Sequence, residues 1–428
     1  MSTFPDTSPK RRQGGVGVAS ARDVALISTS SPPRWRFGLV LLLLAQPAFA
    51  AAQSAQLQTL ESPAREASLI SAKPDGALQF DYQDGAKTVV ASDVISWGAP
   101  VEAEGSQVLL ADGGVLVAGY AGLSEDRLAV DSNLFGGLEL PLTQLAVVVL
   151  RSPTDPWRRD AMLRRLLELS RDTDRLVLEN GDELTGLLVS GNGEKIQLES
   201  TLGVNAKQVI DVPVESVAAI VFNPALRANL RAATKGAWIG LSDGSLMQTE
   251  TWTLDGVELA LTRPGGRPWK STVPQAVRFV QPLGGKVKYL SDLSPEPYRH
   301  VPYLTREWPY QLDRTVSGAR LRAGGRPYVK GVGMHSASRL TFALNREYSR
   351  FEAELAIDDE ALGQGSVVVR VFADAEERYR SPIVRGGDVP LPISVDVSGA
   401  QRLSLVVDHA DRGDQLDRAD WLNARLIK

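Results

Sequence analysis

The sequence predicts a mainly β protein in which tandem small β-barrel repeats precede a C-terminal β-sandwich. Three observations indicate this fold class. A segment that opens around an Asp-Gly or Asn-Gly pair recurs along the chain, short runs after residue 286 alternate between apolar and polar side chains, and helical spacing is confined to short connecting stretches. A length of 428 residues suits several domains rather than one.

Composition excludes several classes of function. The chain has no cysteine, which excludes a disulfide framework, a thiolate metal site and a cysteine nucleophile. Its three histidines all lie in the last third, so a zinc site built from several histidines is not expected. A net charge of −4 and a pI near 5.7 give no basic footprint, and we therefore expect no nucleic-acid partner.

Residues 1–50 have the pattern of a secretory signal peptide with a long basic leader. Six basic side chains precede or adjoin the short apolar run at 37–45, and Ala48 and Ala50 form the small-residue exit. The apolar run is shorter than the about 20 residues of a transmembrane helix. We expect a secreted, periplasmic or cell-surface bacterial protein with no transmembrane segment after cleavage. A buried N-terminal helix is the alternative interpretation.

The region from 69 to 285 repeats itself after a linker at 51–68. Asp-Gly or Asn-Gly pairs begin at Asp112, Asn180 and Asp243, spaced by 68 and 63 residues. Such pairs between apolar runs are the strongest short hairpin signal, because these residues tolerate positive φ. The interpretation divides the region into a decayed copy (68–100) with a first full copy inside 69–153, a second copy at 175–224, and a third within 225–285.

Each copy resembles a small barrel of the Sm-like or SH3-like kind. The second copy shows the features most clearly, with an opening L-x-N-G-D-x-L-x-G at 178–186 and period-two alternation at 195–199. Four or five short strands in about 50 residues suit a strongly bent barrel. We expect these repeats to act as spacers or to dock envelope proteins.

Helical stretches punctuate the repeats. Asp155 before Pro156 suits an N-cap and a first helical position, and apolar residues from Met162 to Leu169 recur at roughly helical spacing, which predicts a connecting helix within 154–174. Its arginines leave two interpretations open, a packing helix with a solvated face or a basic partner-binding helix. A weaker helix is predicted at 225–233.

Residues 286–428 read as an antiparallel sandwich. Phe351, Ala353 and Leu355 alternate with polar residues, and further strand signals follow near 367–372, 393–397 and 403–407. The ordered motifs at 289–293, 328–336, 351–359 and 420–424 resemble the NPCBM/NEW2 domain. That name denotes a carbohydrate-binding module found beside glycoside hydrolases. The resemblance implies a galactose-binding-like jelly-roll sandwich and sugar binding.

A carbohydrate site needs flat aromatic faces and a few convergent polar side chains. The candidates fall into two groups in this domain. The ring faces are Trp308, Tyr310, Tyr328 and Trp421, and the polar groups are Lys330, His335, Asp358, Asp359 and His409. Each has a structural alternative: Trp421 beside Leu422 suits a core position, and His335 after a Gly-x-Gly turn suits a loop contact.

An acidic series, with Asp at 408, 411, 414, 417 and 420, raises the question of calcium. Oxygen-rich loops bind that ion, and Asp411, Asp414 and Asp417 are the candidate ligands. The spacing differs from an EF-hand, and Arg412 and Arg418 lie between the carboxylates. A solvated loop balanced by arginines is therefore the favoured interpretation, with no cofactor expected and calcium as the alternative.

Catalytic signatures are absent from the sequence. It has no G-x-S-x-G elbow, H-E-x-x-H or Walker A motif, and adjacent Asp358 and Asp359 point to opposite faces of an expected strand. We therefore expect an exported, non-catalytic carbohydrate-binding protein with a glycan or polysaccharide partner. An envelope scaffold without sugar binding, and a glycoside hydrolase with an unrecognised site, are the alternatives.

Overall fold

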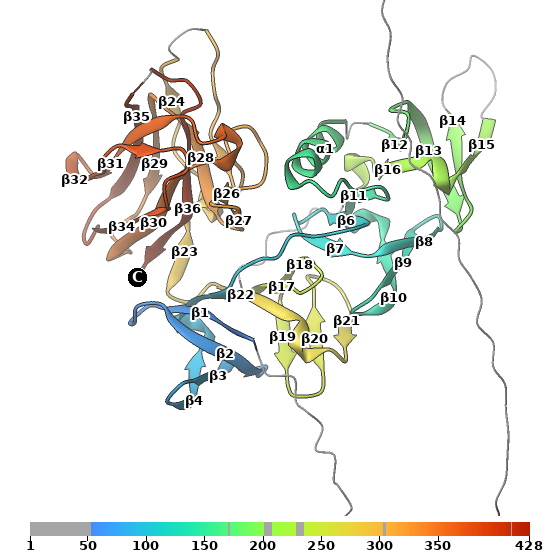
Figure 1. Ribbon diagram of the computed structural model, residues 1–428, viewed down its shortest axis with the longest axis horizontal. Coiled ribbons are helices and arrows are strands. Elements are labelled where there is room, and N and C mark those ends of the chain that lie inside the picture. Colours follow the sequence, from blue (N-terminus) through green and yellow to red (C-terminus); the bar gives the residue numbers. More distant parts are fainter. Residues whose placement is uncertain (1–52, 170–171, 201–207, 228–234, 303–304, 412) are drawn as a thin grey trace, which may run out of the picture. The chain divides into compact units, whose positions relative to one another are not determined.

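The computed structural model describes residues 53–169, 172–200, 208–227, 235–302, 305–411 and 413–428 (Figure 1). The predicted signal peptide lies outside these ranges, as does most of the predicted 225–233 helix. The mainly β fold class is confirmed, with strands dominating both the repeat region and the C-terminal sandwich. No helix in the part of the chain that the structure describes is both long and apolar enough to cross a membrane.

Residues 54–283 form four units, coloured from blue to yellow in Figure 1, with five strands in the first and third and six in the second and fourth, where the second strand is interrupted. The strands of the first unit are β1 (Ser54–Thr59), β2 (Arg65–Ala72), β3 (Ala77–Tyr82), β4 (Gly85–Val90) and β5 (Val94–Gly98). Those of the second are β6 (Gln107–Leu110), β7 (Val115–Val117), β8 (Gly119–Leu123), β9 (Arg127–Ser132), β10 (Gly136–Pro141) and β11 (Leu145–Val149).

The third and fourth units repeat this order. The strands of the third unit are β12 (Asp174–Leu178), β13 (Glu183–Gly191), β14 (Lys195–Ser200), β15 (Gln208–Pro213) and β16 (Val217–Val221). Those of the fourth are β17 (Gly236–Leu241), β18 (Leu246–Thr249), β19 (Thr251–Leu254), β20 (Leu259–Thr262), β21 (Pro268–Ser271) and β22 (Val277–Leu283). β7 with β8, and β18 with β19, each take the place of one interrupted second strand.

The same local devices bend every unit. The second strand carries a register shift or a break, as between Leu69 and Ser71 or between Leu188 and Ser190. A 3₁₀ turn (η1, η2, η3 or η5) precedes each last strand, which then pairs with the first strand of its own unit. Among the described residues no ladder joins the fourth strand to the fifth, so the units are open, bent sheets.

The last strands also join the units in pairs. β11 pairs with β16, with Val148 opposite Ile220, and β22 pairs with β5, with Val280 opposite Trp97. Side chains from all four units contribute to one apolar cluster, which includes Phe80, Leu116, Ile220 and Ile239. Because the four units share one buried cluster, they form a single packed body rather than a row of independent domains.

The copy expected to be decayed is complete, and the stretch expected to be a linker is part of it. β1 and the beginning of β2 occupy 54–68, and β1 pairs with both β2 and β5. The Asp-Gly signal is missing there because the β1–β2 turn contains Ser62-Pro63 instead. The predicted boundary at 68 is therefore corrected to the start of β1.

The connecting helix is confirmed as α1 (Pro156–Leu169). Asp155 caps it, with its Oδ1 accepting a hydrogen bond of 2.8 Å from the amide of Arg158. Met162, Leu163 and Leu166 pack on the outer apolar cluster formed by β11 and β16. This packing supports the interpretation of α1 as a packing helix.

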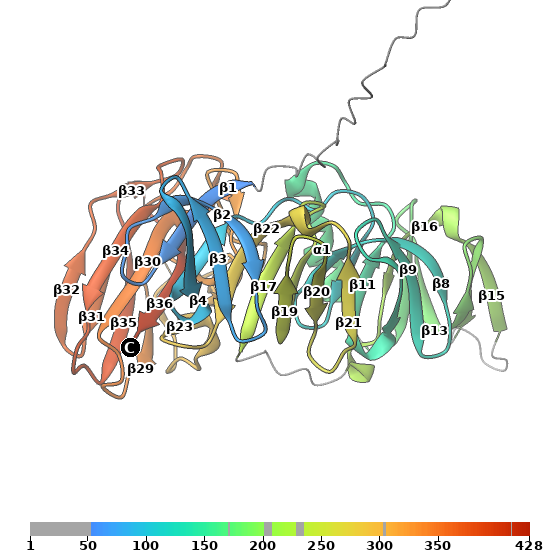
Figure 2. The same ribbon diagram turned by 90° about the horizontal axis from the view of Figure 1, so that it is seen from below.

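The C-terminal domain consists of two packed antiparallel sheets, seen beside each other in Figure 2. One contains β25 (Gln311–Leu312), β28 (Gly331–His335), β36 (Arg418–Ile427), β30 (Arg350–Ile357), β34 (Leu391–Asp396) and β23 (Val287–Tyr289). The other contains β24 (Arg299–His300), β29 (Ser338–Ala343), β35 (Arg402–His409), β31 (Ser366–Ala373), β32 (Glu376–Arg380) and β33 (Val384–Arg385). A small hairpin joins β26 (Arg322–Ala323) to β27 (Arg326–Pro327).

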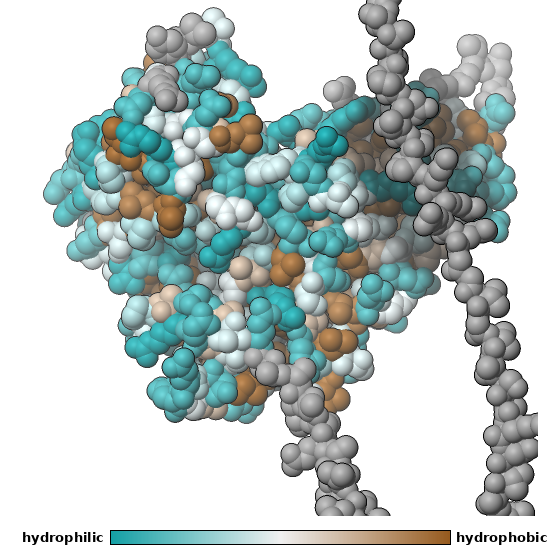
Figure 3. Space-filling model, viewed as in Figure 1, coloured by the Kyte–Doolittle hydropathy of each residue, from teal (hydrophilic) through white to brown (hydrophobic). Residues whose placement is uncertain are grey.

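The sandwich core follows the alternation read from the sequence. Phe351, Ala353 and Leu355 of β30 are buried against Trp421, whereas the intervening residues face outward. On the face shown in Figure 3 hydrophilic residues predominate and hydrophobic ones occur in separate patches. The most exposed large apolar residues, Val389 and Leu362, lie on different loops, which is ordinary for a protein surface.

A buried ion network links the repeats to the sandwich. Glu102, between the first and second units, accepts hydrogen bonds from Arg159 of α1 and Arg322 of β26. Arg322 also pairs with Asp160 at 2.9 Å. Burial opposes the charge of Glu102, but the arginines outweigh it and hold the pKa of this carboxyl below its usual value.

At Gly98, which ends β5, the backbone of β5 lies very close to that of β22. Its φ is +73°, and a Cβ there would lie 1.9 Å from the carbonyl oxygen of Arg278. We expect G98A to lower the free energy of unfolding by more than about 4 kcal/mol, because both strain and a clash result. Urea denaturation measures this loss.

G85A is the matched control. Gly85 also has a positive φ, of +113°, but no atom lies within 4 Å of the position that a Cβ would take there. Strain alone predicts a loss of about 1–3 kcal/mol. Equal losses in the two variants would contradict the close approach of β5 to β22.

Candidate functional site

The predicted site residues do not form one cluster. Tyr328 precedes β28 and His335 ends it, so the strand separates them. Around each lies a distinct arrangement of aromatic and polar side chains. We call these the His335 cluster and the Tyr328 cavity.

The His335 cluster is a set of rings at one end of the sandwich. Trp308 stacks on His335 with centroids 5.0 Å apart and an interplanar angle of 4°, and His300 meets His335 edge-on at 6.0 Å. Tyr298 stacks on His300 and contacts Tyr310 at 5.3 Å. The structure therefore brings three predicted residues, Trp308, Tyr310 and His335, into one cluster.

The faces of these rings are already covered by contacts within the cluster. The guanidinium of Arg306 lies 3.9 Å from the ring centroid of Trp308, which already stacks on His335. His335 is only 3% exposed, and burial lowers its pKa to about 4. A neutral, buried imidazole packed between rings acts as part of the fold more than as an open sugar platform.

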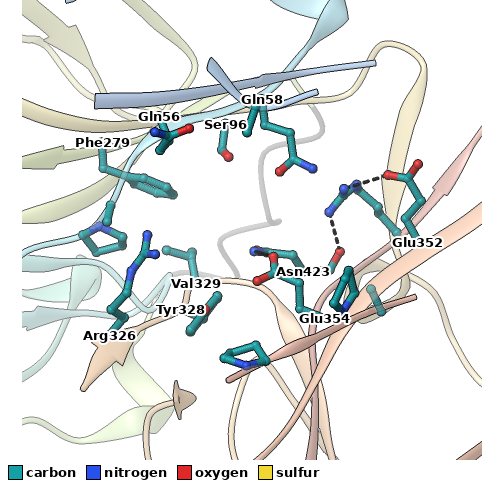
Figure 4. Close-up of a pocket in the computed structure, with 18 of the residues that line it drawn as sticks. Gln56, Gln58, Ser96, Phe279, Arg326, Tyr328, Val329, Glu352, Glu354 and Asn423 are labelled. Atoms are coloured by element: carbon teal, nitrogen blue, oxygen red, sulfur yellow. Dashed lines mark hydrogen bonds and ion pairs between the residues drawn. The ribbon is translucent and has the colours of Figure 1, made fainter. Parts of the chain in front are cut away.

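The Tyr328 cavity is at the opposite end of β28 and has a volume of about 560 Å³ (Figure 4). The first unit contributes Gln56, Gln58 and Ser96, and β22 contributes Phe279. The sandwich contributes residues from the β27 hairpin and from the outer face of the β30–β36 sheet, namely Arg326, Tyr328, Val329, Glu352, Glu354, Asn423 and Arg425.

A β-bulge in β36 aims Asn423 into this cavity. The register between β30 and β36 shifts between Glu352 and Glu354, and Asn423 adopts a φ of +50°. Its amide Nδ2 donates to Glu354 at 3.2 Å, and its backbone N–H donates to the carbonyl of Lys330 at 2.8 Å. Left-handed backbone in a non-glycine residue costs energy, and such positions concentrate at functional sites.

The two glutamates of the cavity have different surroundings. Glu352 binds Arg425 and Arg350, each at 2.7 Å, so its charge is compensated. Glu354 faces Tyr328 and Asn423. Burial, and then the Glu354 carboxylate, raise the pKa of Tyr328 to about 12, so its hydroxyl stays protonated as a donor.

Several polar groups of the cavity are uncommitted. Among the described residues, no hydrogen bond or ion pair engages the side chains of Gln58, Ser96 and Arg326, although all three line the cavity. Amide, hydroxyl and guanidinium groups around an aromatic ring match the alternating polar and apolar faces of a sugar.

Two predicted ligand residues are corrected by the structure. Trp421 is fully buried against Phe351, because β36 turns this residue inward, so it offers no ring face to a ligand. Lys330 is buried and binds Asp292 at 2.7 Å and Asp313 at 3.0 Å. Burial alone lowers a lysine pKa, but these carboxylates outweigh it and raise the pKa of Lys330.

The side chains of Asp358 and Asp359 accept hydrogen bonds from backbone amides. Asp358 is buried and caps the turn η7 (Asp359–Ala361) through the amide of Glu360 at 2.8 Å, so its predicted ligand role is also corrected. Asp359 accepts from the amides of Gly324 and Gly325 at 2.9 and 2.7 Å. The two side chains do not share a face, as the sequence predicted.

The acidic series is divided among separate partners. Asp411 pairs with Arg385 at 2.7 Å, and Asp417 is buried and accepts from the amide of Ser366 at 2.8 Å. Asp414 is half-buried, and His409 is exposed at the end of β35. Within the ranges that the structure describes, no group of three or more acidic or histidine side chains is arranged to hold a metal ion.

Sequence reasoning missed most of the cavity. The alternation of apolar and polar residues in β30 predicts that Glu352 and Glu354 face outward, so the sequence did contain a signal for these two residues. Asn423 depends on a bulge and Gln58 on pairing between distant strands, neither of which has a local signature.

Residues 286–427 match the family described as the NPCBM/NEW2 domain, which confirms the resemblance drawn from the motifs. Alpha-1,3-galactosidase B of Akkermansia muciniphila is 35% identical over 117 residues, 26% of this chain and 15% of that relative. A protein of Renibacterium salmoninarum is 33% identical over 110 residues, 26% of this chain and 7% of the relative. The chain thus spans only a small part of these relatives.

Comparison with solved structures finds CBM51 modules among the matches. The CBM51 module from Clostridium perfringens GH95, in complex with methyl-galactose, is 24% identical, covers 33% of this chain and 99% of its own, and has a TM-score of 0.30. The CBM51-2 and INT domains of Clostridium perfringens ZmpB, in complex with GlcNAc, are 20% identical, cover 53% and 45%, and have a TM-score of 0.31.

Asp358 and Asp420 form a buried carboxyl pair whose titration has a measurable consequence. Three of their oxygens have no hydrogen-bond partner among the described groups, as expected where a proton lies between two carboxyls. Burial raises the pKa of Asp358 to about 7 and that of Asp420 well above its usual value. The pair therefore stabilises the fold fully below about pH 4 and loses that contribution as the pH rises through 7.

We expect D358N to reduce this loss, because an amide cannot ionise. Relative to wild type, the variant should gain about 2–4 °C in melting temperature between pH 5 and pH 8. E347Q, which removes an exposed carboxyl, is the control, and its melting temperature should follow that of wild type across the pH range. A constant difference between D358N and wild type across this range would show that the pair does not share a proton.

Proposed function

We propose that this protein is a non-catalytic glycan-binding protein, and that its ligand occupies the Tyr328 cavity. The observation that carries the proposal is the convergence of two aromatic rings, Tyr328 and Phe279, with uncommitted polar side chains in a cavity of about 560 Å³. That volume lies within the range of ordinary ligand sites, roughly 300–1,000 Å³. The match of residues 286–427 to the NPCBM/NEW2 domain supports a sugar over other small ligands.

Each side of the cavity has a role in this proposal. The ring of Tyr328 packs against the C–H face of a sugar, and its hydroxyl together with Glu354 and Asn423 binds the ring hydroxyls. From the other side, Gln58 and Ser96 bind outward hydroxyls. The first unit therefore completes the site rather than acting only as a spacer.

The carboxylates favour a second candidate, a glycoside hydrolase. Glu352 and Glu354 lie two residues apart on one face of β30, so their Cα atoms are about 6.6 Å apart, and two carboxyls at roughly 5–10 Å can flank a glycosidic bond. Glu352, however, is engaged by ion pairs with Arg350 and Arg425, each at 2.7 Å, which suits a structural role more than a catalytic one.

Location and partners are part of the proposal. The basic leader, apolar run and Ala48–Ala50 exit support export and cleavage of residues 1–50, which places the module where polysaccharides occur. Mass spectrometry of the mature chain tests this, and the expected first residue is Ala51. Envelope proteins remain the proposed partners of the repeats, and a pull-down without sugar retention would favour the scaffold alternative.

We expect Y328A to weaken glycan binding at least about tenfold, because it removes the stacking ring and a hydroxyl donor. A glycan array with residues 51–428 identifies the sugar, and isothermal titration measures its affinity for wild type and variant. Y328F should retain the ring contact and lose less.

Tyr348 supplies the control, since it is a half-buried sandwich tyrosine that does not line the cavity. Y348A should bind like wild type, although its melting temperature should fall because Tyr348 packs against the sandwich core. Equal affinities of Y328A and wild type would exclude the cavity as the site. Release of reducing sugar by wild type but not by E354Q would favour the hydrolase.

A further inference from the structure

A second cavity, away from Tyr328, is lined by arginines. It has a volume of about 210 Å³ and lies between α1, the β6–β7 turn and the loop that precedes β26. Among the described residues, Asp160 is its only acidic lining residue. Five arginines line it, namely Arg159, Arg164, Arg227, Arg314 and Arg320. We call this the arginine cavity.

Three of the five arginines are engaged within the protein. Arg159 binds Glu102, Arg164 donates to the carbonyl of Ser317 at 3.2 Å, and Arg227 donates to the carbonyl of Phe222 at 3.3 Å. Asp160 is itself bound by Arg322 at 2.9 Å. The acidic charge near the cavity is therefore already paired.

Arg314 and Arg320 are the exceptions. Both are half-buried, and within the described ranges neither guanidinium makes a hydrogen bond or an ion pair. Burial, the first cause, lowers the pKa of each, although the charge of Asp160 opposes this lowering at both arginines. The charge of Arg314 adds to the lowering at Arg320. Two partly desolvated cations close together are costly unless an anion compensates them.

The loop geometry brings these two side chains together. The amide of Thr315 donates to the carbonyl of Ala319 at 3.0 Å, which closes a tight turn over 315–319. Arg314 and Arg320 flank this closed turn, both line the cavity, and they are near enough for the charge of Arg314 to act on Arg320. Two adjacent guanidinium forks match the oxygens of a carboxylate or sulfate, which they bind by paired hydrogen bonds.

We propose that the arginine cavity binds an oxyanion group, held by Arg314 and Arg320. The volume of the arginine cavity is several times the about 30 Å³ that one water molecule occupies. The cavity therefore accommodates one carboxylate or sulfate group and its immediate neighbours. The source is either an acidic sugar, which rests on the proposed function, or a free inorganic anion. Asp160 is ion-paired to Arg322 at 2.9 Å, so its charge offsets those of Arg314 and Arg320 only in part and leaves a net positive cavity.

The test uses residues 51–428 and thermal unfolding in sodium sulfate against sodium chloride at equal ionic strength. A bound anion stabilises by RT ln(1 + [L]/Kd), so wild type should melt higher in sulfate. R314Q and R320Q should each raise the dissociation constant for sulfate at least about tenfold. Without anion they should be no less stable than wild type, because each removes a partly desolvated charge that makes no direct hydrogen bond or ion pair.

R299Q is the matched control, since Arg299 is an exposed arginine of β24 outside the cavity. It should respond to sulfate as wild type does. An equal response of R314Q, R320Q and wild type, or no difference between sulfate and chloride, would overturn the proposal.

Further arms identify the source of the oxyanion. Stabilisation by glucuronate or a sulfated sugar, but not by glucose, assigns an acidic sugar. Stabilisation by sulfate and phosphate without a response to these sugars assigns a free anion. Because Y328A leaves the arginine cavity intact, its effect on neutral glycans reports on the proposed function separately.

Discussion

The register of β36 is the constraint on which the candidate site depends. This strand lies at the centre of its sheet, between β28 and β30, and pairs with β23 near its end. Before the bulge it turns Trp421 into the core, and at the bulge it turns Asn423 outward. Because side chains alternate along a strand, the inserted residue decides which groups reach the cavity.

The first unit gives the outer face of that sheet a second wall. Pairing of β22 with β5 fixes the position of the first unit on the repeat body, and Tyr289 of the sandwich packs against Ile95 of β5. Gln281, which follows the two residues of β22 that pair with β5, donates to the hydroxyl of Tyr289 at 2.7 Å. The contacts that unite repeats and sandwich thus also border the Tyr328 cavity, which gives the repeats a direct part in recognition.

Prediction from the sequence succeeded where the signals were local. Asp-Gly and Asn-Gly pairs identified three hairpins because positive φ is needed at a tight turn, whereas the first unit was underestimated because its β1–β2 turn has no such pair. Tyr328 was found as a ring candidate, whereas Trp421 was given both as a ring candidate and as a core residue, and its burial supports the core interpretation. Gln58 and Ser96 are placed by the pairing of β1 with β5 and meet the sandwich only through tertiary packing, for which the sequence carries no local pattern.

A crystal structure of residues 51–428 with a bound glycan would show most directly whether the Tyr328 cavity is the ligand site. We expect a sugar ring against Tyr328, with hydroxyls bonded to Glu354 and Asn423 on one side and Gln58 on the other. A sugar bound at the His335 cluster, with the Tyr328 cavity holding only water, would contradict this assignment.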